Sequence, residues 1–281
     1  MKELTLMNNF NRYMKESMNE DYQNLVKDIN GNFKFYYDNS YAVNIYSYFV
    51  KRGFNSKELN FKNNSKNLPI CSVSSSARLC LLYFLKNHKN DDFYLEQSYP
   101  ILKTDGKTLT NAHPDAILGN TYYECKAQEV VNGENEKLRE SYLTSAKWFK
   151  EFFIDDKMLS VDNGYLEFDM SALGISVQKK YYDLKLDIKQ LLCHLLAIAN
   201  VTDKTNDCWT LKYLIFRPSR KFDEYLQEIY DEVDAEFDSI LNGKNGITIF
   251  CDKHNITILK EYVYMDDLDE EIVNDLGCCF K

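Results

Sequence analysis

Apolar residues recur along the chain with two periods, one typical of amphipathic helices and the other typical of half-buried strands. The clearest helical stripe runs from about Tyr182 to Asn200, where apolar positions follow one another at steps of four and three residues. A cluster of good N-cap residues, Ser72 to Ser76, precedes another apolar segment. On these grounds we predict helices over residues 77–86, 137–153, 182–200 and 222–241.

Strands are predicted where β-prone apolar residues alternate with polar ones or form short runs between turn residues. These segments are residues 93–102, 113–118, 121–127, 211–216, 246–251 and 256–264. Because the helical and strand patterns are interleaved along the chain, the predicted fold class is α/β, with a mixed central sheet flanked by helices.

The domain organisation follows from one break in these patterns. Residues 55–68 are rich in Asn and Lys and follow neither period. We therefore predict a mainly helical N-terminal extension over residues 1–70 and a larger domain over residues 71–281.

Composition narrows the class of protein. No apolar run approaches the roughly 20 residues that a membrane-spanning helix needs, and the N-terminus has no apolar signal segment. The eight cysteines have neither C-x-x-C spacing nor the Cys/His spacing of zinc sites, which indicates reduced thiols. We expect a cytoplasmic protein without a membrane span.

The charge is unevenly distributed along the chain. The formal net charge is −9, and residues 221–281 carry 16 acidic residues against 5 basic ones. This balance disfavours binding to nucleic acid through a uniformly basic surface. A locally basic cleft, or divalent cations held by acidic ligands, can still bind a polyanion.

The most informative segment contains a short predicted hairpin. The Gly-Asn pair at residues 119–120 is a favourable two-residue turn of the II′ type between two strand-like runs. The resulting register places Leu118 opposite Thr121 and Asp115 opposite Glu124. Directly opposed carboxylates repel each other unless a cation lies between them.

Alternation along the second strand adds a third charged group to this pair. Lys126 projects from the same face as Glu124, while Cys125 points to the other face. Two hard oxygen ligands beside an ammonium group suit Mg²⁺-assisted hydrolysis of a phosphodiester, in which the metal polarises the phosphate and activates water. The alternative is an exposed hairpin whose charged side chains only face solvent.

With the PD dipeptide at residues 114–115 and the ECK tripeptide at residues 124–126, the chain resembles the PD-(D/E)xK superfamily of restriction-endonuclease-like phosphodiesterases. No other E-x-K tripeptide occurs in the sequence. The resemblance covers about residues 72–216 and implies a restriction-endonuclease-like core with the element order α-β-β-β-α-β.

The resemblance also implies roles for individual residues. Asp115 and Glu124 are expected to ligate a metal ion together with the main-chain carbonyl of Cys125, and Lys126 to act at the nucleophile. The implied cofactor is Mg²⁺, for which Mn²⁺ is expected to substitute. Family members often carry a further acidic residue ahead of the PD element, and Glu96 is the candidate for this metal-binding and catalytic role, unless it faces solvent.

Some members place a catalytic Gln on the helix after the motif strands, and Gln190 is similarly placed. The usual aromatic partner four residues later is replaced by His194, so the pair can also be read as polar surface. Candidate contacts to nucleic acid lie at the end of a predicted core strand and in the basic N-terminal part. They are Arg217, Arg220, Lys62 and Lys66.

These features predict a Mg²⁺-dependent endodeoxyribonuclease, such as a restriction or phage-defence enzyme, acting on double-stranded DNA. Cleavage of both strands by this fold generally needs two active sites, so a homodimer is expected. Two alternatives stay open. One is a non-catalytic interaction protein on the same fold, acting through its acidic C-terminal region, and the other is a nuclease acting on RNA or on structured or single-stranded nucleic acid.

Overall fold

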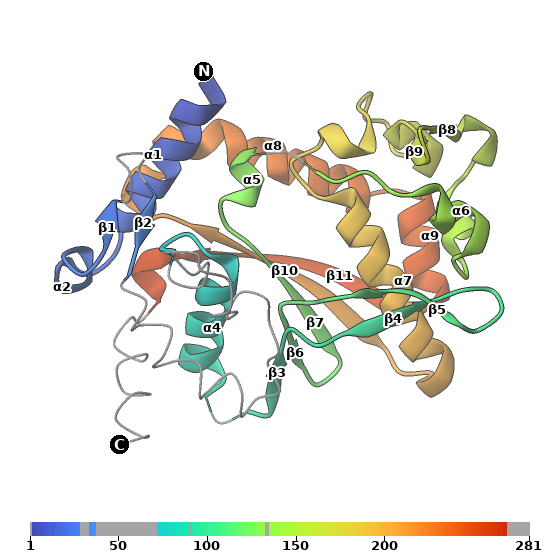
Figure 1. Ribbon diagram of the computed structural model, residues 1–281, viewed down its shortest axis with the longest axis horizontal. Helices are drawn as coiled ribbons and strands as arrows, with labels where there is room; N and C mark the ends of the chain where they lie inside the picture. Colours follow the sequence, from blue (N-terminus) through green and yellow to red (C-terminus); the bar gives the residue numbers. More distant parts are fainter. Residues whose placement is uncertain (1, 29–33, 38–71, 90, 133–134, 269–281) are drawn as a thin grey trace.

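The computed structural model describes residues 2–28, 34–37, 72–89, 91–132 and 135–268 (Figure 1). A five-stranded sheet runs through its centre, made of β3 (Phe93–Leu95), β6 (Ala116–Leu118), β7 (Thr121–Lys126), β10 (Trp209–Arg217) and β11 (Ile256–Tyr264). The order across the sheet is β11-β10-β7-β6-β3, with parallel pairing from β11 to β7 and antiparallel pairing from β7 to β3. The predicted α/β class with a mixed sheet is confirmed.

Helices cover both faces of this sheet. They are α4 (Ser76–Asn87), α7 (Ile188–Thr205), α8 (Asp223–Leu241) and the shorter α9 (Gly246–Lys253). Side chains alternate along β7, so Tyr123 meets Phe84 of α4 with ring centroids 4.8 Å apart, whereas the next residue, Glu124, faces α7. Figure 1 accordingly shows α4 on one side of the sheet and α7 and α8 on the other.

Short elements connect the sheet to its helices. Two further hairpins are β4 (Tyr99–Leu102) with β5 (Thr108–Ala112), and β8 (Ser160–Asp162) with β9 (Tyr165–Glu167). The short helices are α5 (Glu129–Asn132) and α6 (Glu140–Ser145), and the 3₁₀ turns are η3 (Phe149–Phe152), η4 (Asp156–Met158), η5 (Met170–Leu173), η6 (Tyr181–Asp183), η7 (Arg220–Phe222) and η8 (Met265–Asp267).

The strand predicted over residues 246–251 is wrong, because this segment forms helix α9. Asn245 accepts the main-chain N–H of Thr248 at 3.0 Å, and the Thr248 hydroxyl accepts the Asn245 N–H at 3.0 Å. This capping box satisfies the first main-chain donors of a helix and overrides the β-prone composition of the run.

Two other predicted elements are broken into pieces. The strand predicted over residues 93–102 is interrupted at Glu96, whose left-handed backbone (φ +49°) separates β3 from β4. The helix predicted over residues 137–153 is wrong as a single element. Only α6 and η3 are helical there. Arg139 is extended because it pairs with Tyr165 of β9, and the break between α6 and η3 lies where Ala146 pairs with Lys103 and Trp148 has a φ of +65°.

The described part of the first 70 residues packs on the rest of the chain. It contains α1 (Lys2–Glu16), α2 (Glu20–Gln23) and a two-stranded sheet of β1 (Lys27–Asp28) and β2 (Phe35–Tyr36). On α1, Phe10 is fully buried, and the Tyr13 ring stacks on Phe222 with centroids 4.4 Å apart. The polar segment predicted as a seam, with Lys62 and Lys66, lies outside the described residues.

Among the residues that the structure describes, no helix is both long enough and apolar enough to cross a bilayer. The described cysteines are Cys80, Cys125, Cys193, Cys208 and Cys251, and all five are free thiols.

The N-terminal end of α7 is held in place by a buried carboxylate on α8. Glu236 accepts the main-chain N–H groups of Lys185 at 3.1 Å and Leu186 at 2.9 Å. Asp187 then caps the helix by accepting the N–H of Gln190 at 2.9 Å. These contacts determine where α7 begins and therefore which of its side chains reach the sheet.

The Glu236 anchor predicts a pH dependence of stability. Burial raises the pKa of Glu236 above its ordinary value of 4.5, against the opposing effect of its two main-chain donors. The native state then binds the proton more tightly than the unfolded state, so the contribution of this group falls as pH rises through its folded pKa. In urea denaturation, we expect the unfolding free energy of the wild type minus that of Glu236→Gln to decrease as pH rises above the ordinary pKa of 4.5.

A matched control is Glu228→Gln, which removes a charge from the same helix at an exposed position and should leave the pH dependence unchanged. If the difference between the wild type and Glu236→Gln grew with pH, the native state would not hold the proton at Glu236.

Candidate active site

The β6–β7 hairpin has the predicted register. Ala116 pairs with Tyr123 and Leu118 pairs with Thr121. Gly119 has φ +55°, which the first position of a II′ turn requires and which glycine adopts without a steric penalty. The turn therefore places the residue that precedes β6, Asp115, beside the C-terminal half of β7.

Asp115 is half-buried and is tied to both neighbouring segments. Its Oδ2 accepts the main-chain N–H of Cys125 at 2.6 Å, and its carbonyl accepts the N–H of Glu96 at 3.0 Å. Two main-chain contacts thus hold the PD dipeptide between the end of β3 and strand β7.

Glu124 lies at the centre of the site and has only 2% of its surface exposed. Its Oε1 is 2.9 Å from the Lys126 ammonium, and its Oε2 is 2.8 Å from His194 Nε2. The Lys126 Nζ also donates to Gln190 Oε1. The structure therefore brings Glu124 and Lys126 together, as the sequence predicts, and adds Gln190, which the sequence left open as a polar surface residue.

Helix α7 supplies two polar side chains from consecutive turns. Gln190 reaches Lys126, and His194, with 1% of its surface exposed, reaches Glu124. The role of His194 was not predicted from the sequence. The available signal was its four-residue spacing from Gln190, which places both on one helical face.

The charged groups of the site shift one another's pKa values strongly because they are buried. Burial raises the pKa of Asp115 well above its ordinary value, and the Glu124 carboxylate raises it further. Burial also opposes ionisation of Glu124, but Lys126 and His194 outweigh it, so the pKa of Glu124 is lowered. For Lys126, burial is outweighed by Glu124 and Glu129, which raise its pKa.

The donor atoms at the site are oxygens, which hard divalent cations prefer as ligands. Asp115 and Glu124 are carboxylates, and the carbonyl of Cys125 lies between Glu124 and Lys126 in the chain. Asp115 is contacted by a neutral main-chain donor and faces Glu124, so a cation beside it would relieve the repulsion that raises its pKa. Among the described residues, no group of three or more His, Cys, Asp or Glu side chains is arranged to hold a metal ion.

Glu96 lies beside the site rather than in a strand. It occupies the connection between β3 and β4, its main chain contacts Asp115, and its charge contributes to the raised pKa of Asp115. Because Glu96 lies next to Asp115, it remains a candidate for a further metal ligand.

The two arginines that follow β10 are occupied by other contacts. Arg217 is buried, is 2.9 Å from Asp223, and lies over the Tyr230 ring at 3.8 Å from its centroid. Arg220 is more exposed and pairs with Asp267 at 2.9 Å. Both therefore have intramolecular partners where the sequence suggested contacts to nucleic acid.

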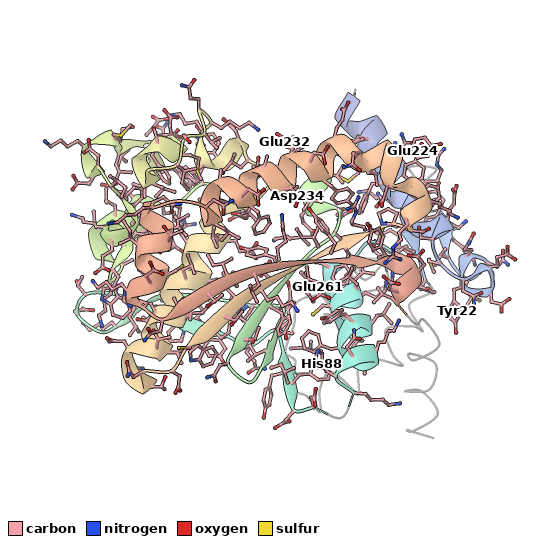
Figure 2. All side chains as sticks on the ribbon, turned by 180° about the vertical axis from the view of Figure 1, so that it is seen from behind. Tyr22, His88, Glu224, Glu232, Asp234 and Glu261 are labelled. Carbon is pink, nitrogen blue, oxygen red and sulfur yellow. The ribbon has the colours of Figure 1, made fainter. Side chains whose placement is uncertain are left out.

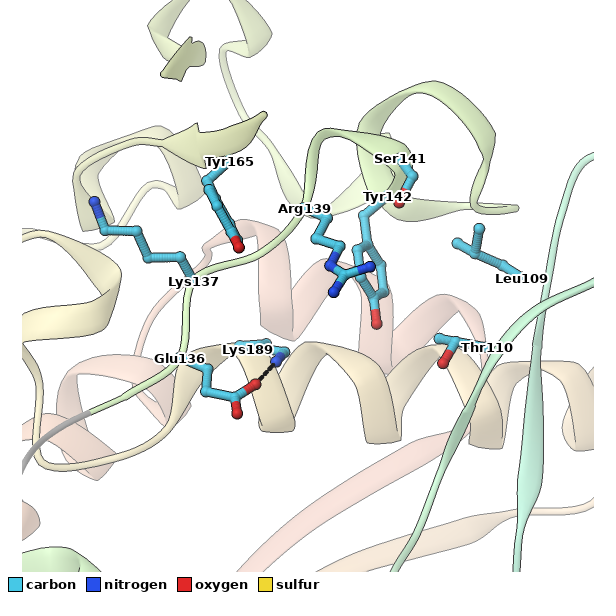
Figure 3. A pocket seen from close by; sticks show the side chains of 9 residues that line it. All are labelled: Leu109, Thr110, Glu136, Lys137, Arg139, Ser141, Tyr142, Tyr165 and Lys189. Atoms are coloured by element: carbon cyan, nitrogen blue, oxygen red, sulfur yellow. Dashed lines mark hydrogen bonds and ion pairs between the residues drawn. The ribbon is translucent and has the colours of Figure 1, made fainter. Parts of the chain in front are cut away.

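Two adjoining cavities lie next to the site, between the start of α7, the β5 strand and residues 136–142. The smaller, of about 420 Å³, is lined in part by Gln190 and His194. The larger, of about 660 Å³, is lined in part by Arg139 and Tyr165 (Figure 3). These cavities were not foreseen, because their walls come from segments that are far apart in the sequence.

No family model matches the chain, and no curated protein or solved structure matches it significantly.

Proposed function

We propose that the chain is a metal-dependent endonuclease that hydrolyses phosphodiester bonds in DNA. The observation that carries this proposal is the convergence of Asp115, Glu124 and Lys126 on one patch through the register of the β6–β7 hairpin. The element order α4, β3, β6, β7, α7, β10 supports a restriction-endonuclease-like core, with the β4–β5 hairpin inserted before β6.

The residues of the site divide the chemistry among them. Asp115, Glu124 and the carbonyl of Cys125 would hold Mg²⁺ or Mn²⁺, which polarises the phosphate and activates water when bound. Lys126 would stabilise negative charge beside the attacking water. Gln190 orients the Lys126 ammonium, and His194 fixes the second oxygen of Glu124.

A cleavage assay tests this proposal. Supercoiled plasmid, linear duplex, single-stranded DNA and RNA are incubated with Mg²⁺, with Mn²⁺ or with EDTA. We expect metal-dependent cutting of DNA that falls at least about a hundredfold in Asp115→Asn, because the loss of one charged group that acts at the reacting centre has an effect of this size.

The chain itself offers a matched control. Asp105 and Lys107 repeat the D-x-K spacing in an exposed turn, where they pair at 3.5 Å. Asp105→Asn removes an equivalent charge away from the hairpin and should cut like the wild type. If no substrate is cut with either metal, the proposal fails.

A non-catalytic interaction protein is the second candidate, and the acidity of α8 favours it. This helix carries eight acidic and no basic residues, and Figure 2 shows Glu224, Glu232 and Asp234 distributed along it. Such a protein would be indifferent to Mg²⁺. The same assay would identify a nuclease that acts on RNA, because RNA is among its substrates. The proposed chemistry acts on the phosphate, which DNA and RNA share.

The biological role, the location and the form of the DNA substrate are part of the same proposal. A restriction or phage-defence role, a cytoplasmic location and double-stranded DNA as the substrate all rest on the nuclease assignment. So does a homodimer, which would provide one active site for each strand.

A further inference from the structure

The two cavities beside the site form one groove. Thr110, Glu136, Tyr142 and Lys189 line both of them. At its inner end the groove is bounded by Gln190 and His194, which contact Lys126 and Glu124, respectively. A ligand lying in the groove therefore approaches the candidate active site from the side of α7.

The outer end of the groove carries a cation and an aromatic ring side by side. Arg139 and Tyr165 face each other across an isolated antiparallel bridge, and the flanking main chain is tied by Glu140 N–H to the Gly164 carbonyl at 2.9 Å. In Figure 3 the Tyr165 ring and the Arg139 guanidinium both point toward α7. The backbone thus holds this pair in place without a ligand.

The charges of the outer cavity favour an anion despite the acidity of the whole chain. Its lining includes Lys137, Arg139 and Lys189 against one carboxylate, Glu136. Lys189 pairs with Glu136, and Lys137 pairs with Glu167. Among the described residues, the Arg139 guanidinium forms no ion pair within 4.0 Å. It helps to lower the pKa of Glu136, but the ion pair of that carboxylate is with Lys189, so Arg139 can still pair with a ligand.

We propose that this groove binds an unpaired stretch of a nucleic-acid strand, with a base stacked on Tyr165 and a phosphate on Arg139. Cationic grooves with exposed aromatic rings are typical of single-strand binding, because an unpaired base offers a free face for stacking. Tyr165 is 40% exposed, and the cavity beside it, about 660 Å³, has the size of pockets that enclose small ligands. A nucleotide fits such a space, whereas a duplex would have to lie across its mouth.

This inference rests on the proposed nuclease function and refines its substrate. A strand lying in the groove would bring its phosphodiester up to Gln190 and His194, the two α7 side chains that contact Lys126 and Glu124. The preferred substrate would therefore be a duplex with a single-stranded segment next to the cleavage position, as in a frayed end or a flap.

Binding measured without cleavage tests the groove. Fluorescence anisotropy in EDTA compares a labelled oligothymidylate of about 12 nucleotides with a duplex of the same length, using the full chain. We expect tighter binding of the single strand, and about tenfold weaker binding in Tyr165→Ala that Tyr165→Phe restores, because phenylalanine keeps the stacking ring. In Arg139→Ala, the slope of log affinity against log salt should fall in magnitude by about 0.7, corresponding to one lost phosphate contact.

The controls are exposed residues of equivalent character elsewhere on the surface. Lys244→Ala removes one positive charge, and Tyr225→Ala removes a tyrosine ring that is 58% exposed. Both should bind like the wild type. If the controls lost as much binding affinity as the groove variants, the proposal that this groove binds the strand would be wrong.

Two further outcomes would also overturn it, namely duplex binding as tight as single-strand binding, or displacement of the strand by oligoglutamate at equal charge concentration. The two proposals can fail separately. If no substrate is cut but binding follows the expected pattern, the nuclease proposal is wrong and the binding groove stands. If DNA is cut but the Arg139 and Tyr165 variants bind like the wild type, only the binding groove is wrong.

Discussion

Replacing Lys126 by methionine should destabilise the protein by about 3 kcal/mol at neutral pH, because removal of one partner leaves a buried charge without compensation. The Lys126 side chain is 12% exposed and lies 2.9 Å from Glu124, which is 2% exposed. Methionine keeps most of the volume of the side chain, so the loss reports charge rather than packing. His194 still contacts Glu124 in the variant, which places the expected value at the lower end of the range for buried pairs.

A double-mutant cycle separates this interaction from other effects. Glu124→Gln removes the buried charge, so Lys126→Met should cost less than about 1 kcal/mol in that background. Lys107→Met is the matched control, because Lys107 is 79% exposed and its pairing with Asp105 contributes little. Chemical denaturation measures all four variants. Equal losses at Lys126 and Lys107 would show that the buried pair does not form.

The same variant also tests whether a cation binds at the site. A divalent cation beside Asp115 and Glu124 would replace part of the missing positive charge, so Mg²⁺ should raise the melting temperature of Lys126→Met more than that of the wild type. Cleavage by the folded fraction should fall about a hundredfold to a thousandfold, because the group that stabilises charge at the nucleophile is gone. A variant that is destabilised but cuts at the wild-type rate would assign Lys126 a purely structural role.

The central hairpin was predictable from the sequence for a physical reason. Register in a two-residue hairpin depends on the turn, and Gly119 adopts the positive φ that this turn needs. Once the register is fixed, alternation places Glu124 and Lys126 on one face and Cys125 on the other. The same local rules predicted the stripe of α7, and with it the position of Gln190. The helix begins at Ile188 rather than at Tyr182, because Glu236 and Asp187 bind the main chain at its start.

Contacts between distant segments were not predictable in this way. His194 is polar and could equally face solvent, and its burial depends on how α7 docks on β7. Arg217 follows a core strand, where functional loops are common, yet Asp223 and the Tyr230 ring hold it. Periodicity within one segment carries no information about partners that another segment supplies.

The segment 246–251 shows how a local signal can mislead. Its β-branched and aromatic residues match a short strand, whereas the capping box at Asn245 begins a helix. The helix then packs Phe250 against Phe152 with ring centroids 4.1 Å apart. Tertiary packing and one cap therefore outweigh the intrinsic preference of six residues.

Gly246→Ala tests this packing and is expected to destabilise the protein by about 3 kcal/mol. A Cβ at this position would lie 1.7 Å from the Phe152 carbonyl oxygen and 2.6 Å from its carbonyl carbon. Both atoms belong to the backbone and cannot rotate away, so α9 or the η3 turn must shift. Helix propensity alone predicts the opposite sign, because alanine is favoured over glycine inside a helix by about 1 kcal/mol.

Gly243→Ala provides the comparison for this substitution. Gly243 has φ +83°, and a Cβ on it would meet no described atom within 4 Å, so alanine there meets backbone strain of about 1 kcal/mol without a clash. Urea denaturation of both variants should therefore rank Gly246→Ala as clearly less stable than Gly243→Ala. The reverse order would mean that α9 does not approach η3 as closely as described. A large loss at Gly246 would show that a residue favourable for the helix in isolation is excluded by the surface on which the helix rests.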